Sequence, residues 1–225
     1  MELTVQKLHP ALRSGRRLFI DGSDSPTFSF QGSFDSSCAL HATAMALALQ
    51  RRMLNPLRPT SRYNPDERKF IRQVLPYWHS GISMADLHTL IWELNLGLRP
   101  LLFEGTHSDV IRFCEQEVRQ GWPVVMAFRE SHRVGQHAVL IVGVEGRQIG
   151  RVFDGHTLLA IDSSEGEPSL AAYNARLTWA NGNRTCDGHS VYETTFDRKR
   201  VVVTEAISLR SVSKRRRRSD RPPKS

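Results

Sequence analysis

A cysteine, a histidine and an aspartate occur along this chain in positions where they could act together. Cys38 follows a polar loop and opens an apolar, alanine-rich segment, whereas His137 begins one apolar run and Asp162 ends another. A thiol nucleophile needs a base that takes its proton and later protonates a leaving group, and that base needs a polar partner that fixes its tautomer. These residues predict covalent catalysis with Cys38 as nucleophile, His137 as general base and acid, and Asp162 as orienting group.

Cys38 stands where a helix is expected to begin. Asp35, Ser36 and Ser37 are favourable N-cap residues, and apolar residues recur at helical spacing from Cys38 to about Gln50. The helix dipole stabilises an anion at this end of a helix, and a neighbouring imidazolium can lower a thiol pKa from about 8.5 into the range of roughly 3.5 to 7.5. The position therefore favours a reactive thiolate, and the competing interpretation is a small, buried apolar residue.

Acyl transfer also needs hydrogen-bond donors for the oxyanion that develops in the transition state. The backbone N–H of Cys38 can supply one donor, and the side-chain amide of Gln31, in the preceding loop, can supply another. His41 follows Cys38 by three residues and shares its helix face, so it is the alternative base to His137.

At this point the sequence resembles papain-like cysteine peptidases, and most closely the C39-like branch known from bacterial peptidases. The resemblance rests on Gln31 with the SCAL segment of residues 37–40, on QHAVLIVG at residues 136–143, and on AIDS at residues 160–163. It implies the same nucleophile, base and orienting group, with Gln31 as the oxyanion donor. A peptide or protein is the substrate that this resemblance implies.

The chain is predicted to form helices first and strands second. Helices are expected to begin at Cys38, Pro65, Ser83 and Ser108, because each of these positions combines capping residues with an amphipathic or apolar run. Compact β-branched runs without helical spacing predict strands, of which the two at 123–128 and 137–144 are apolar on both faces and are expected to pair in antiparallel fashion. The further strands are expected at residues 149–153, 158–162, 190–196 and 201–209.

This order, taken with the resemblance, predicts an α+β, papain-like fold. An N-terminal helical lobe would carry the nucleophile helix and pack on a C-terminal antiparallel β-sheet. We expect an N-terminal extension at residues 1–17, a C39-type peptidase domain at 18–210, and a disordered basic tail at 211–225.

The positive charge of the chain is concentrated in its last residues. The formal net charge is +8, and residues 213–225 contribute seven Lys or Arg against one Asp, which leaves +2 for the rest. Such a segment cannot bury apolar surface, so disorder is expected. The run from Lys214 to Arg218 could contact nucleic acid or another anionic surface weakly and without sequence preference.

Three cysteines without CxxC spacing argue against a disulfide framework and a zinc site. Cys114 is expected in the core and Cys186 in an exposed loop, both without a chemical role. No apolar segment resembles a signal peptide or a membrane span, so we expect a cytoplasmic protein. The C39-like resemblance implies a bacterial protein, and we expect it to need no cofactor.

Two alternatives to a hydrolase remain open. Transglutaminases and arylamine N-acetyltransferases also use Cys, His and Asp in this order, and the sequence does not decide whether water or an amine resolves a thioester on Cys38. A non-catalytic module that binds an anionic partner through its basic tail is the alternative from a different class.

Overall fold

The computed structural model describes residues 2–23, 25–32, 35–56, 64–130, 135–179 and 188–212. Cys186 and the run from Lys214 to Arg218 lie outside these ranges. The described helices are α1 (Cys38–Leu49), α2 (Pro65–Val74), the 3-10 turn η1 (Leu75–Tyr77), α3 (Met84–Leu94) and α4 (His107–Arg119). The described strands are β1 (Glu2–Leu8), β2 (Leu12–Arg13), β3 (Phe19–Ile20), β4 (Leu98–Glu104), β5 (Val124–Glu130), β6 (His137–Ile149), β7 (Val152–Ile161), β8 (Ala175–Thr178), β9 (Ser190–Thr194) and β10 (Arg198–Ser211).

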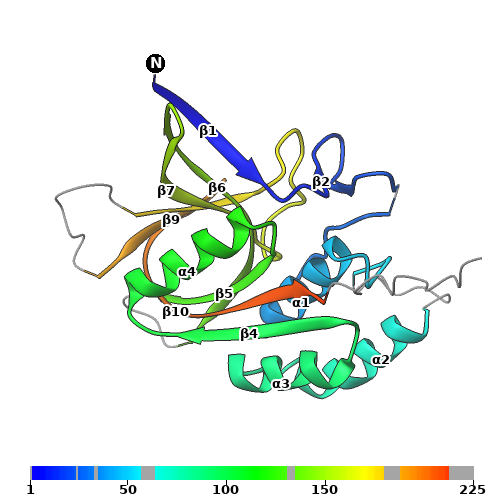
Figure 1. The fold of residues 1–225 in the computed structure, drawn as a ribbon. Coiled ribbons are helices and arrows are strands. Elements are labelled where there is room, and N and C mark those ends of the chain that lie inside the picture. Colours follow the sequence, from blue (N-terminus) through cyan, green and yellow to red (C-terminus); the bar gives the residue numbers. More distant parts are fainter. Residues whose placement is uncertain are drawn as a thin grey trace, which may run out of the picture.

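Six antiparallel strands form a closed barrel. Neighbours follow the order β6, β5, β10, β9, β8 and β7, and β7 then pairs with β6 again. Two further strands extend this sheet, since β1 pairs with β6 and β4 pairs with β10. Figure 1 shows α1, α2 and α3 grouped to one side of the strands and α4 lying across β5 and β10.

The expected α+β, papain-like fold, with an N-terminal helical lobe on a C-terminal sheet, is wrong. The described part of the chain is mostly sheet, its barrel is closed, and the four α-helices found there are short. The N-terminal part of the chain, which was expected to form a helical lobe, also contributes strands to the sheet, because β1 precedes α1 and β4 lies between α3 and α4. Local sequence pattern identifies apolar runs but not their distant pairing partners, which is why the closure of β7 onto β6 was missed.

Register shifts in the β6–β7 pairing allow the sheet to curl until it closes. One shift lies between Ile141 and Gly143, and the other between Glu145 and Gly146. An extra residue on one strand bends that strand and increases its twist. At Gly146 the backbone of β7 approaches so closely that a Cβ atom would lie 2.8 Å from the carbonyl carbon of Asp154. The barrel therefore needs a glycine at this position.

Strands β5 and β6 are buried on both faces, and their pairing confirms the antiparallel arrangement expected from their composition. Alternate residues contribute to two different cores. Val125 and Leu140 pack in a core with α1, α2 and α3, whereas Met126 and Ile141 pack in a second core closed by α4. All six barrel strands contribute to the second core, which is the barrel interior.

The predicted helices are present, with small differences at their ends. Asn64 and Glu67 form the expected capping box of α2, and Ser83 caps α3. The cap of α4 is Thr106 rather than Ser108, and the C-cap of α3 is Asn95 in a left-handed conformation. None of the described helices is long and apolar enough to span a membrane.

We expect Gly146→Ala to lower the free energy of unfolding by about 1 to 3 kcal/mol, the range typical of overpacking. The added methyl group would force β6 and β7 apart where the barrel closes. Gly15→Ala is the matched control, because the nearest atom to its added Cβ lies at an ordinary contact distance of 3.9 Å. Equal effects of both substitutions in urea unfolding would contradict the role given to Gly146.

Candidate functional site

The structure brings the three predicted catalytic side chains to one end of the barrel. Cys38 is the first residue of α1, and His137 is the first residue of β6. Asp162 directly follows β7, whose last residue, Ile161, pairs with Leu140 of β6. His137 and Asp162 thus lie at the same end of two neighbouring strands, and His137 Nε2 lies 2.9 Å from each carboxylate oxygen of Asp162.

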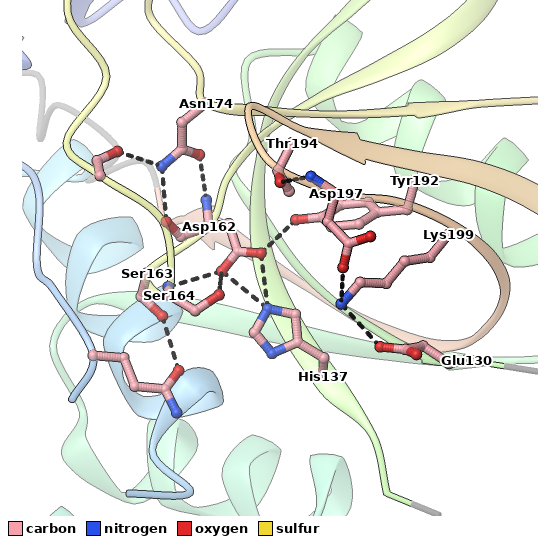
Figure 2. Close-up of polar contacts among 12 residues, drawn as sticks. Glu130, His137, Asp162, Ser163, Ser164, Asn174, Tyr192, Thr194, Asp197 and Lys199 are labelled. Carbon is pink, nitrogen blue, oxygen red and sulfur yellow. Dashed lines mark hydrogen bonds and ion pairs between the residues drawn. The ribbon is translucent and has the colours of Figure 1, made fainter. Parts of the chain in front are cut away.

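Asp162 is almost fully buried, with its side chain 3% exposed, and its charge is stabilised by several donors. Besides His137, the hydroxyl of Tyr192 donates to Oδ2 at 2.6 Å, and Ser164 donates to Oδ1 through its backbone N–H at 2.9 Å and its hydroxyl at 2.7 Å (Figure 2). Burial acts to raise the carboxyl pKa, but these hydrogen bonds and the charge of His137 outweigh it and lower the pKa to about 2. Asp162 is therefore ionised at neutral pH.

The imidazole of His137 is held in its protonated form. Burial acts to lower its pKa, but the hydrogen bonds and charges of Asp162 and Cys38 raise the pKa to about 10. Since Asp162 takes Nε2, Nδ1 is the nitrogen left to face the sulfur of Cys38. The ring also packs edge-on against Phe128, at 5.5 Å between ring centroids, so its orientation is fixed by packing as well.

The thiol of Cys38 has the electrostatic surroundings of a nucleophile. Burial acts to raise its pKa, but the hydrogen bond and charge of His137, together with the backbone N–H groups of Ala138 and Ala39, lower the pKa below the usual value. Every residue of α1 after Cys38 is buried, which anchors the helix and leaves only its first residue partly exposed. His137 therefore stabilises the thiolate form of Cys38, and Cys38 in turn stabilises the imidazolium form of His137.

The loop before α1 is held by its own side chains. Ser37 is the N-cap residue, as expected, but it makes no capping hydrogen bond, and its hydroxyl donates to Asp35 instead. Gln31 is anchored twice to the strand end beyond β7, because its backbone N–H donates to the carbonyl of Ser163 at 2.8 Å and its Oε1 accepts from the Ser163 hydroxyl at 3.3 Å. These contacts fix the loop beside Asp162.

Gln31 can serve as an oxyanion donor only through its amide nitrogen. Nε2 donates one hydrogen to the carbonyl oxygen of Asp35 at 2.9 Å, and an amide nitrogen carries two hydrogens. The residue lines a pocket that also contains His137 and Asp162. Its second N–H is used by none of the hydrogen bonds among the described residues.

His41, the alternative base, is placed away from this chemistry. It is 3% exposed, its Nδ1 lies 2.7 Å from the Ser29 hydroxyl, and its ring meets Trp78 edge-on. Burial lowers its pKa to about 4, against the opposing charge of Asp35. His41 is a neutral core residue, so the structure favours His137 as the base.

Two pockets meet at His137. The first, of about 360 Å³, contains Cys38. Its lining consists of small or neutral side chains from the start of α1, the loop before α3, the start of β6 and the turn before β6. The second, of about 250 Å³, contains Asp162 and is lined by polar and charged side chains. Cys38 lines only the first pocket and Asp162 only the second.

Several residues of the site carried no recognisable signal in the sequence. Tyr192 reaches Asp162 from β9, and Asn174 holds the Asp162 backbone by accepting from its N–H at 2.7 Å and donating to its carbonyl at 2.8 Å. Both lie far from Asp162 in the sequence, so only the pairing of β7, β8 and β9 makes them neighbours. Ser164 could have been found, because a serine two residues after an aspartate commonly donates to it in a turn.

No group of three or more His, Cys, Asp or Glu side chains in the described ranges is arranged to hold a metal ion. Comparison of the sequence with models of known protein families finds no match, and comparison with characterised proteins finds no significant match.

We expect iodoacetamide to modify Cys38 well before Cys114, which is fully buried and whose pKa is raised chiefly by that burial. The rate at Cys38 should be nearly flat between about pH 6 and 8, since His137 keeps its proton until about pH 10. Intact-protein and peptide mass spectrometry measure both rates in one sample.

His137→Ala should convert this flat profile into a steep rise with pH, because the thiol then keeps the burial that raises its pKa and loses the imidazolium that lowers it. His41→Ala is the matched control and should leave the profile flat. A flat profile in His137→Ala, or a steep one in His41→Ala, would show that His137 does not activate Cys38.

Proposed function

We propose that this protein is a cysteine hydrolase that cleaves a peptide or isopeptide bond through a thioester on Cys38. The observation that carries the proposal is the thiol at a helix N-terminus, activated by an imidazole that a buried carboxylate holds at 2.9 Å. A nucleophile, a base and a third group that orients the base are the arrangement that covalent acyl transfer requires.

Acylation would begin from the ion pair. The Cys38 thiolate attacks the substrate carbonyl carbon, and the resulting oxyanion accepts hydrogen bonds from the backbone N–H of Cys38 and the free N–H of Gln31. The first N–H groups of a helix have no partner within it, so the Cys38 N–H is suited to this role. His137 then donates its Nδ1 proton to the departing amine, and the C–N bond breaks to leave a thioester.

Deacylation would reverse these roles. A water molecule gives a proton to the now neutral His137 and attacks the thioester carbon, which releases the acid and restores the thiolate–imidazolium pair. Asp162 keeps its charge throughout, since its part is to hold the ring and stabilise the imidazolium. Such chemistry suits a reducing, cytoplasmic compartment. The contact of the run from Lys214 to Arg218 with an anionic partner is a separate point, and it stays a prediction.

We expect 4-nitrophenyl N-acetylglycinate, a small neutral acyl donor, to acylate the protein at Cys38 and to be turned over with release of 4-nitrophenolate. Cys38→Ala should abolish the adduct, and Asp162→Asn should retain the adduct but turn over far more slowly, because the carboxylate acts on the imidazole. Intact-protein mass spectrometry and nitrophenolate absorbance measure these outcomes. Absence of an adduct on Cys38 would disprove the proposed function.

We expect Gln31→Glu, which preserves the size of the side chain but removes its N–H donors, to lower kcat for this ester by about ten- to a thousandfold, as is usual for loss of one oxyanion donor. The matched control is Gln148→Glu, since the Gln148 amide donates to the carbonyl of Gly150 at the far end of β6. An unchanged kcat for Gln31→Glu would assign the second donor to another group.

A further inference from the structure

The two pockets that meet at His137 differ in charge. Among the described residues, Cys38 and the shared His137 are the only ionisable groups that line the pocket containing Cys38, whereas Glu130, Lys199 and Glu165 line the pocket that contains Asp162. Figure 2 shows Glu130 and Lys199 on the same side of the imidazole as Tyr192. A substrate that spans both pockets would therefore meet a neutral surface on one side of His137 and a charged surface on the other.

If the proposed function holds, the reaction places the acyl half of the substrate in one pocket and the leaving-amine half in the other. The acyl group becomes bonded to the sulfur, so it occupies the pocket that Cys38 lines. The leaving amine receives its proton from Nδ1 of His137, so its nitrogen lies beside Cys38, and its side chain extends past the imidazole into the pocket that His137 lines without Cys38. The charged pocket is thus the leaving-group pocket.

Most charges in the leaving-group pocket are balanced by neighbours. Asp162 is paired with His137, and Glu130 accepts from Lys199 at 3.0 Å. Lys199 is also shared with Asp197 at 3.0 Å, so its ammonium group already faces two carboxylates. These groups leave no surplus positive charge for an anionic ligand.

Glu165 is the exception. Its backbone N–H donates to the carbonyl of Asp162 at 3.4 Å, which fixes the residue beside the catalytic carboxylate. Its half-buried carboxylate makes no ion pair or hydrogen bond with any of the described residues, yet it lines the pocket. It also faces Tyr192, whose pKa is raised first by burial, then by Asp162 and then by Glu165. A half-buried carboxylate that has no partner among the described residues favours a cation.

We propose that the leaving group of the substrate is an amine with a positively charged side chain, recognised by Glu165. In a peptide substrate, this is an arginine or lysine directly after the bond that is cleaved. The inference rests on the proposed function, because it takes Cys38 as the acylated residue.

The leaving-group pocket can be tested without knowledge of the natural substrate, because an amine that attacks the thioester must bind where the leaving amine departs. The probe is Cys38 acylated by 4-nitrophenyl N-acetylglycinate, and the competing acceptors are L-argininamide and L-citrullinamide, which match in size but not in charge. In aminolysis the amine nitrogen of the acceptor bonds to the carbonyl carbon of the thioester, the C–S bond to Cys38 breaks, and the amine proton passes to His137. Liquid chromatography with mass spectrometry measures the two amide products.

We expect argininamide to be captured roughly three- to fivefold faster than citrullinamide, a preference typical of a partly exposed ion pair. This ratio should fall with added salt. Glu165→Gln should bring the ratio close to one, and Glu165→Lys should bring it below one. The matched control is Glu193→Gln, which removes an equal charge from a carboxylate that pairs with Arg198 outside the pocket and should preserve the ratio.

Each failure has a distinct meaning. If no acyl-enzyme forms on Cys38, the proposed function fails and the inference fails with it. Three outcomes overturn the inference alone, once the acyl-enzyme has formed. In the first the ratio is one, in the second neither amine is captured, and in the third Glu193→Gln changes the ratio as much as Glu165→Gln does. Circular dichroism of each variant separates these outcomes from loss of folding.

Discussion

The contact between His137 and Asp162 is the interaction on which the site depends. It joins the start of β6 to the residue after β7, and both carboxylate oxygens lie 2.9 Å from the same imidazole nitrogen. A buried carboxylate is costly unless its charge is compensated, and here an imidazolium supplies the compensation. The same contact raises the pKa of His137, against the effect of burial, and the resulting imidazolium then lowers the pKa of Cys38. One ion pair thus favours the thiolate form of Cys38.

Barrel closure provides the rest of the carboxylate's environment. Tyr192 lies on β9, which reaches the end of β7 through β8, and its buried hydroxyl donates to Asp162 at 2.6 Å. Phe128 of β5 packs against both the His137 and the Tyr192 ring. Side chains of β5 and β9 in the barrel interior therefore support the histidine that begins β6 and the aspartate that follows β7. An open sheet would leave these side chains exposed to water, which weakens such electrostatic interactions.

Helix α1 brings the nucleophile to this barrel from outside. Its residues pack against one face of β5 and β6, while the opposite face of the same strands fills the barrel interior. The helix is apolar on all sides because it is fully buried after Cys38. The thiol is thus fixed in the first pocket, beside the histidine at which the two pockets meet, and the different linings of the pockets give the site a neutral side and a charged side.

The sequence by itself determined the local elements and the chemical residues. Capping residues placed the starts of α1, α2 and α3, β-branched composition identified β5 and β6, and residue type with position selected Cys38, His137 and Asp162. Only the tertiary structure decided the fold class, because the closure of β7 onto β6 and the pairing of β1 and β4 join segments that are distant in sequence. It also decided between His41 and His137, and it added Tyr192, Asn174 and Glu165, because burial and partner distance are properties of the folded chain. Periodicity records which face of a segment is apolar, but it does not record which other segment covers that face.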